Sequence, residues 1–166
     1  MPREPLDYPY GTDGSLVAAR EWLAHNVAGD GARCPCCGQG ARLYQRRLNA
    51  GVSASLCLIY REAVATGQDW VHVPSLFDRL GASKIRRAGG EYAKGLLWGL
   101  LEERVGPGAQ GWYRPTEQGV MFVLEQATMP EYVVVYAGDV KGTEGRQITV
   151  RESLRDEYDY EDLMSW

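Results

Sequence analysis

The sequence lacks any run of 18 apolar residues and has only two histidines, and each absence narrows the range of functions. A transmembrane helix needs about 20 apolar residues, so no membrane span and no membrane partner are expected. The first residues, MPREPLDYPYGTDG, have no apolar signal core, which predicts a cytoplasmic protein. There is no P-loop or Rossmann glycine pattern, and two histidines offer few general bases. We therefore do not expect an enzyme.

Charge is unevenly distributed along the 166 residues, whose net charge is −4. Residues 33–94 contain ten basic and four acidic side chains, a balance of +6, and the remaining residues carry −10. The negative total argues against a strong general nucleic-acid binder. The basic middle is nevertheless compatible with a local phosphate-binding face, and equally with acidic ends that fold over it.

Cys34 and Cys37 form a C-x-x-C motif that is followed directly by Gly38. Cytoplasmic cysteines are usually reduced, so metal binding is favoured over a disulfide. Two thiolates at this spacing reach one tetrahedral ion, and the glycine permits a tight turn whose amides point at sulfur. The motif predicts a zinc knuckle with a structural Zn²⁺. The alternative is a surface turn with reduced thiols.

Two further zinc ligands are needed, and the sequence has no second C-x-x-C. Cys57 lies in an apolar helical pattern and is interpreted as a core residue. Cys36 is adjacent to Cys37, which makes regular coordination of one ion by both awkward. The predicted ligand set, with His25 as a further candidate, is Cys34, Cys37, His72 and Cys36. We expect about one zinc per chain, absent when Cys34 and Cys37 are replaced by serine.

Helices are predicted from capping residues and apolar periodicity. Asp13 is a candidate N-cap for a helix that extends to residue 27, and Asn49 for a helix that ends before Gly67. A short strand is expected at residues 70–73. A further helix at residues 75–80 would begin with a capping box formed by Ser75 and Asp78.

The stretch from residue 82 to residue 126 predicts a turn, a helix at 90–98, a strand at 100–105, a glycine-rich loop, a strand at 112–114 and a final helix. Thr116 is the expected N-cap of that final helix. Its inward face should contain Val120, Val123 and Leu124.

This order of elements resembles the recognition half of bacterial winged-helix regulators, in which a "GLIE" strand leads through the wing to a "Y-x-x-T-x-x-G" helix start. The matching residues here are LLEE at 100–103 and WYRPTEQG at 112–119. The CPCCGQ motif, the VHVP stretch at 71–74 and the C-terminal DYEDLM are also similar to a group of small phage and prophage proteins. The resemblance implies a winged-helix fold and favours a phage or prophage regulator.

DNA contacts are expected in the turn and the following helix, where cations would bind phosphates. The predicted DNA-binding residues are Lys84, Arg86, Arg87 and Lys94, with Arg46 and Arg47 as outlying contacts. The non-core positions of the recognition helix would be Glu91, Lys94, Gly95 and Trp98. None of these is an Arg, Asn or Gln, the residues that discriminate bases, which argues against sequence-specific readout.

The C-terminal part predicts a β-hairpin and an acidic segment from residue 152, either docked by Leu163, Met164 and Trp166 or binding a basic partner. The fold class is α+β, with a winged helix-turn-helix core. The expected divisions are an arm at 1–12, a helix and knuckle at 13–48, the core at 49–126 and the hairpin with its acidic segment at 127–166. The expected partner is double-stranded DNA, alternatively a host protein bound by the same scaffold, and a homodimer is left open.

Overall fold

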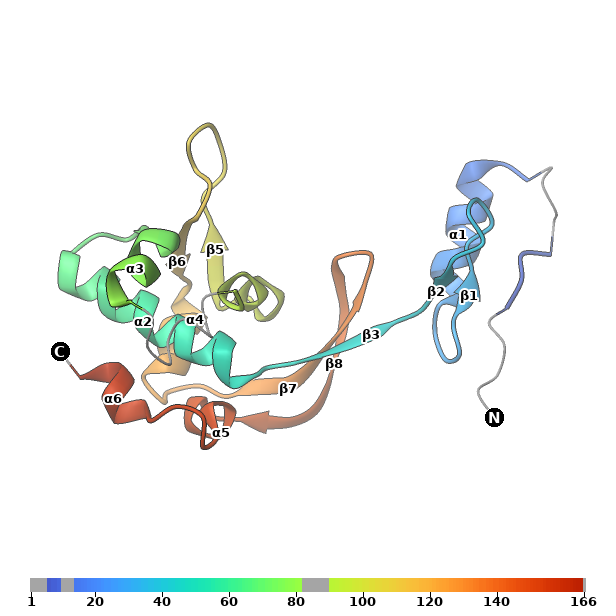
Figure 1. The fold of residues 1–166 in the computed structure, drawn as a ribbon. Coiled ribbons are helices and arrows are strands. Elements are labelled where there is room, and N and C mark those ends of the chain that lie inside the picture. Colours follow the sequence, from blue (N-terminus) through green and yellow to red (C-terminus); the bar gives the residue numbers. More distant parts are fainter. Residues whose placement is uncertain (1–5, 10–13, 82–89, 166) are drawn as a thin grey trace. The chain divides into compact units, whose positions relative to one another are not determined.

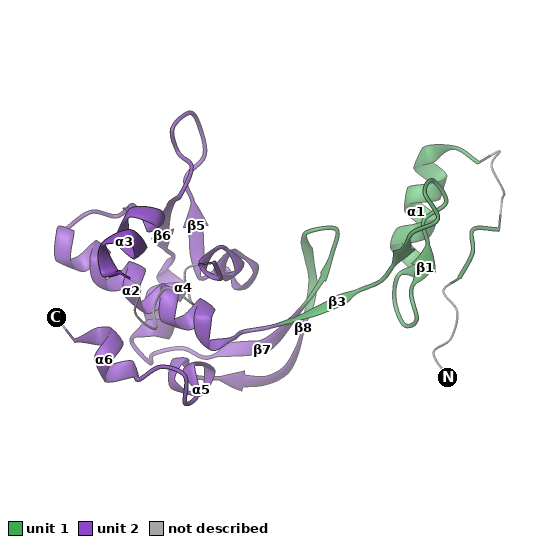
Figure 2. Cartoon of the chain, in the orientation of Figure 1, with its two compact units in different colours: residues 1–46, 134–142 green, residues 47–133, 143–166 purple. Residues whose placement is uncertain are grey.

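The computed structural model describes residues 6–9, 14–81 and 90–165, which fold into helices and small sheets (Figure 1). The fold class is mixed α+β, as predicted. The chain divides into two compact units (Figure 2). Unit 1 comprises residues 1–46 and 134–142, and unit 2 comprises residues 47–133 and 143–166. Within the described ranges, no helix combines the length and apolar character that crossing a bilayer requires.

Unit 1 begins with helix α1, Leu16–Asn26. Its N-cap is Ser15, whose Oγ accepts a hydrogen bond from the Ala18 amide at 3.1 Å. The predicted cap, Asp13, is wrong, because the helix begins at Leu16 and an N-cap must directly precede the first helical residue. Ala19 is buried, whereas Leu16 is exposed, so the apolar side chains of this helix are only partly covered.

Two short strands of unit 1, β1 (Ala32–Arg33) and β2 (Gly40–Ala41), pair antiparallel and enclose the cysteine turn. A second sheet has the strand order β3-β7-β8. Its strands are β3 (Tyr44–Arg47), β7 (Met129–Tyr136) and β8 (Asp139–Ile148). The chain passes from one unit to the other within each of these three strands. Both units therefore include part of the predicted C-terminal hairpin.

Helix α2, Ala50–Thr66, is the centre of unit 2. Asn49 caps it by accepting from the Val52 amide at 2.9 Å, and Gly67 ends it in the left-handed conformation, both as predicted. All residues from Val52 to Ile59 are buried, so the helix is covered on all sides along this stretch, whereas Val64 near its end is exposed. Cys57 is one of them, which confirms its interpretation as a core residue.

After α2 come β4 (Val71–His72), α3 (Val73–Leu80) and, beyond residues 82–89, a 3₁₀ helix η3 (Tyr92–Trp98). The predicted capping box of Ser75 and Asp78 is wrong, because α3 begins two residues earlier, with His72 as its N-cap and no side-chain cap bond. The Ser75 hydroxyl instead lies 2.6 Å from His72 Nδ1.

The predicted helix at 90–98 is 3₁₀ and not α-helical, and this changes which residues face the core. A 3₁₀ helix has three residues per turn, so Tyr92, Gly95 and Trp98 share one row. Gly95 and Trp98 are buried, and the Trp98 indole donates to the Pro130 carbonyl at 2.9 Å. Trp98 and Gly95 are therefore core residues, and the expectation that they face outward is wrong. Leu96, which the apolar periodicity of an α-helix would place inside, is exposed.

Strands β5 (Leu101–Glu103) and β6 (Trp112–Pro115) form the predicted hairpin. Both pairings in this sheet are antiparallel, and its order is β4-β6-β5, with Val71 opposite Tyr113. Helix α4 (Glu117–Val123) follows and is capped by Thr116, as predicted. Its buried residues are Gly119, Phe122 and Val123, whereas Leu124 follows the end of the helix and is 38% exposed, which corrects the predicted inward face.

The C-terminal segment forms α5 (Val150–Leu154) and α6 (Tyr160–Met164). Leu163 is buried, and Arg61 of α2 donates to the carbonyls of Leu163 and Ser165 at 2.9 Å. The Tyr160 hydroxyl donates to the Val123 carbonyl at 2.7 Å. The acidic segment is therefore docked on unit 2 by its apolar and aromatic side chains.

Gly119 provides the first test of this fold. A Cβ at this position would lie 2.1 Å from the carbonyl oxygen of Leu100, the residue directly before β5, so α4 could not keep its close approach to the backbone there. We expect Gly119→Ala to lower the free energy of unfolding by about 2 kcal/mol or more, measured by urea denaturation. Gly90→Ala is the matched control, because a Cβ there meets nothing within 4 Å. Equal stability of the two variants would contradict the packing described.

Candidate nucleic-acid interface and cysteine turn

Three of the predicted DNA-binding residues, Lys84, Arg86 and Arg87, lie outside the described residues. Lys94 lies on η3 with 45% of its side chain exposed, and its Nζ is 2.6 Å from Glu91 Oε2. A phosphate would therefore compete with Glu91 for this ammonium group.

Glu91 is also bonded to the start of α2. The Asn49 Nδ2 group donates to Glu91 Oε2 at 2.9 Å, while Asn49 Oδ1 caps α2. The hydrogen bond from Asn49, followed by that from Lys94, holds the pKa of Glu91 below its usual range. One asparagine thus joins the first turn of α2 to the residue that precedes η3.

The β5–β6 loop extends away from the helices of unit 2 (Figure 1). Val105 in this loop is 94% exposed. Arg104 beside it is exposed, and among the described residues no carboxylate forms an ion pair with its side chain. Sequence reasoning missed Arg104, although a single cation at the start of a glycine-rich loop could have indicated it.

The acidic residues of β5 have partners inside the sheet. Arg114 Nη2 lies 2.6 Å from Glu102 Oε2, and its guanidinium lies 4.8 Å from the centre of the Trp70 ring. The Tyr113 hydroxyl donates to Glu103 Oε1 at 3.0 Å. Burial, together with the Glu103 carboxylate, raises the pKa of Tyr113 to about 12, so this donor keeps its proton. Arg104 is thus the charged residue of this hairpin that the described contacts leave without a partner.

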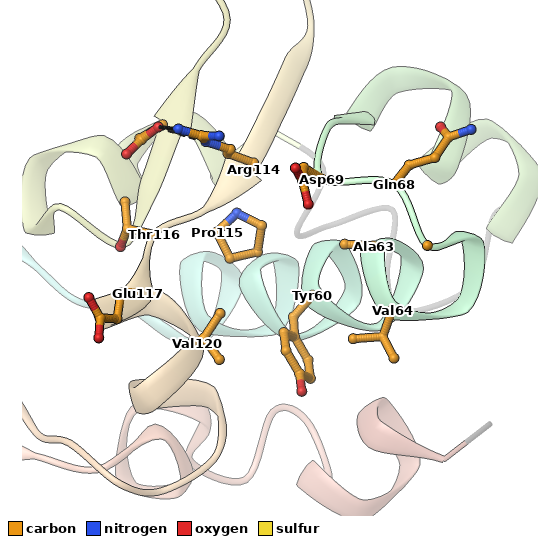
Figure 3. Close-up of a pocket in the computed structure, with 12 residues that line it drawn as sticks. Tyr60, Ala63, Val64, Gln68, Asp69, Arg114, Pro115, Thr116, Glu117 and Val120 are labelled. Atoms are coloured by element: carbon orange, nitrogen blue, oxygen red, sulfur yellow. Dashed lines mark hydrogen bonds and ion pairs between the residues drawn. The ribbon is translucent and has the colours of Figure 1, made fainter.

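A groove of about 440 Å³ lies between α2, β6 and α4 (Figure 3). Its floor includes Tyr60, Val64 and Val120, and its acidic residues are Asp69, Glu102 and Glu117. The one cation that lines it among the described residues, Arg114, is bonded to Glu102. An anionic phosphate would meet net negative charge here, so the groove does not belong to a DNA interface.

The outlying contacts differ in how accessible they are. Arg47 forms an ion pair with Glu131 and lies 5.7 Å from the centre of the Tyr132 ring. Arg46 is exposed, and its guanidinium lies 5.8 Å from the ring of the exposed Tyr44. Of the two, Arg46 has the more accessible charge.

The cysteine turn has the hydrogen bonds that a knuckle requires. The Cys34 amide donates to the Gln39 carbonyl, and the Gly38 amide donates to the Cys34 carbonyl, both at 2.8 Å. Gly38 has a φ of +70°, a conformation that glycine adopts without strain. The backbone amides of Cys36 and Cys37 donate to the Cys34 sulfur and lower the pKa of this thiol. Cys36 and Cys37 are exposed and Cys34 partly so.

The remaining predicted ligands do not join this turn in one group. The residues that the structure describes contain no set of three or more His, Cys, Asp or Glu side chains placed to hold a metal ion. His72 belongs to unit 2, where it contacts Ser75 and the Trp112 ring. His25 of α1 donates from Nδ1 to the Glu21 carbonyl at 2.7 Å. Cys57 is 0% exposed, and its burial raises the pKa of the thiol to about 12.

Comparisons of the chain with protein-family models, curated proteins and solved structures find no match. Its function is therefore inferred from the residues and contacts described above.

The Asn49–Glu91 contact predicts how stability depends on pH. A carboxylate whose pKa is lowered by folding stabilises the native state above its unfolded pKa, and this contribution disappears as the pH falls through the folded value. We expect Glu91→Gln to lower the free energy of unfolding, measured by urea denaturation, by less than about 1 kcal/mol at about pH 7, because the site is partly exposed, and to have little effect at about pH 3. The exposed Glu157→Gln is the control. A Glu91→Gln deficit that is equal at both pH values would argue against the ionised contact.

Proposed function

We propose that unit 2 is a winged helix that binds double-stranded DNA through the segment 82–89, η3 and the β5–β6 loop. The sheet order β4-β6-β5 carries this proposal. In this order β4, the short strand between α2 and α3, pairs with the hairpin of β5 and β6 that follows η3. This is the order of elements that the resemblance implies. That resemblance favours the role of a phage or prophage regulator.

The charges of these segments support binding to phosphates. Residues 82–89 read ASKIRRAG, with three cations and no acid. Arg104 adds a cation in the loop of the hairpin, and the acids of β5 already have partners. Lys94 would gain a phosphate at the expense of its ion pair with Glu91, a contact between exposed groups that costs little to break.

The same residues predict limited base readout. The sequence of η3 is YAKGLLW, and its side chains Tyr92 and Trp98 pack inward or toward other rings. Of the outward residues of η3, only Lys94 can donate a hydrogen bond from its side chain. Affinity should therefore come mainly from phosphate contacts, which depend strongly on salt and weakly on sequence.

Fluorescence anisotropy with a random-sequence duplex at about 50 mM and about 200 mM salt tests this proposal. We expect micromolar binding that weakens steeply with salt. Arg104→Ala and the pair Arg86→Ala with Arg87→Ala should each weaken binding. Each should also reduce the slope of log K against log salt, by about 0.9 for every phosphate that the variant no longer neutralises.

Arg146→Gln is the matched control, because it removes one positive charge from β8, outside the proposed interface. An equal weakening of binding in the control and in Arg104→Ala would indicate only a general charge effect. Absence of binding at low salt would refute the DNA proposal.

The alternative, a module that binds a host protein, receives less support from the C-terminal segment. Leu163 and Tyr160, which a partner protein would be expected to contact, already bond to residues of α2 and α4 within this chain. What remains exposed is mainly acidic, so such a partner would have to be basic.

A further inference from the structure

The cysteine turn is half of a tetrahedral metal site. Cys34 and Cys37 are held in one turn that is closed by two backbone hydrogen bonds, and two amides already point at the Cys34 sulfur. Both thiols reach the surface. Structural zinc is almost always bound by four protein ligands, so two are missing.

The chain has few other soft donors, and the structure describes all of them. All four cysteines and both histidines lie within the described residues. Cys57 is fully buried in α2, and His72 of unit 2 is hydrogen-bonded to Ser75. Cys36 and His25 share unit 1 with the turn, yet no described group of three ligands includes them. Among the described residues, Cys34 and Cys37 therefore offer two sulfur ligands at the surface, and no group of further donors is placed to complete a site with them.

We propose that Cys34 and Cys37 bind one Zn²⁺ together with Cys34 and Cys37 of a second copy of this chain. Two copies related by a two-fold axis present the same pair of thiolates, which completes a Cys₄ tetrahedron. The proposal does not rest on DNA binding, because the turn belongs to unit 1 and the proposed DNA-binding segments follow in the part of the chain that forms unit 2.

The charge around the turn fits such a site. Residues 31–61 contain five arginines and no Asp or Glu. Four thiolates on one Zn²⁺ carry a net charge of about −2, which the flanking Arg42 would offset, together with Arg33, whose guanidinium also lies 3.4 Å from Asp7 Oδ1 in an exposed ion pair. Without the metal, the same cations of two copies would repel each other. The dimer should therefore depend on zinc.

The test is the zinc content and mass of the purified chain, kept reduced with a phosphine that does not bind zinc. We expect a dimer by light scattering and about one zinc for every two chains, in place of the one zinc per chain expected from the sequence for a site completed within the chain. Removal of the metal with a chelator should give monomers, and added Zn²⁺ should restore the dimer. With Co²⁺ in place of zinc, the thiolate-to-metal absorption per ion should correspond to four thiolates.

Cys34→Ser and Cys37→Ser should each abolish both the zinc and the dimer. Cys36→Ser is the matched control within the same turn and should keep both, as should His72→Gln. About one zinc on each monomer would overturn the proposal in favour of a site completed within the chain. A chain without zinc, or a dimer that survives in Cys34→Ser, would also overturn it. If the serine variants do not fold, the zinc-to-chain ratio of the natural sequence still decides.

Discussion

The burial of α2 on all sides from Val52 to Ile59 is the constraint on which unit 2 depends. Its residues from Val52 to Ile59 are all buried, and it contacts β4, α3, η3, β6, α4, α5 and α6. Such burial leaves no room for unpaired polar groups. Ser53 meets this requirement by accepting from Ser153 at 2.7 Å, and Ser55 by donating to the Gly51 carbonyl at 2.7 Å.

The position of the proposed DNA-binding elements follows from this packing. Asn49 caps α2 and bonds Glu91, so the start of the central helix also orients the entry to η3. Gly95 then lies close to Leu101, which brings η3 against β5. The hairpin is attached to the sheet through β4, and its loop carries Arg104 outward. The charged surface is thus supported by buried contacts in which it takes no part.

Different interactions stabilise the two units. Unit 2 has a core of large apolar side chains, among them Phe122, Leu56 and Leu100. The cysteine turn of unit 1 is held mainly by backbone hydrogen bonds and a left-handed glycine. A metal ion contributes most where a small unit buries little apolar surface, which agrees with a zinc site in unit 1.

Local signals in the sequence determined the features that depend on neighbouring residues only. The caps at Asn49 and Thr116, the helix end at Gly67 and the turn that directs amides at Cys34 all join groups within a few residues of one another. Tertiary structure decided the rest, because the partners are distant in sequence. Arg47 meets Glu131 because strands β3 and β7 pair in one sheet, and Trp98 of η3, which packs on α2, donates to the Pro130 carbonyl. Residues 92–98 form a 3₁₀ helix, which apolar periodicity alone did not distinguish from an α-helix.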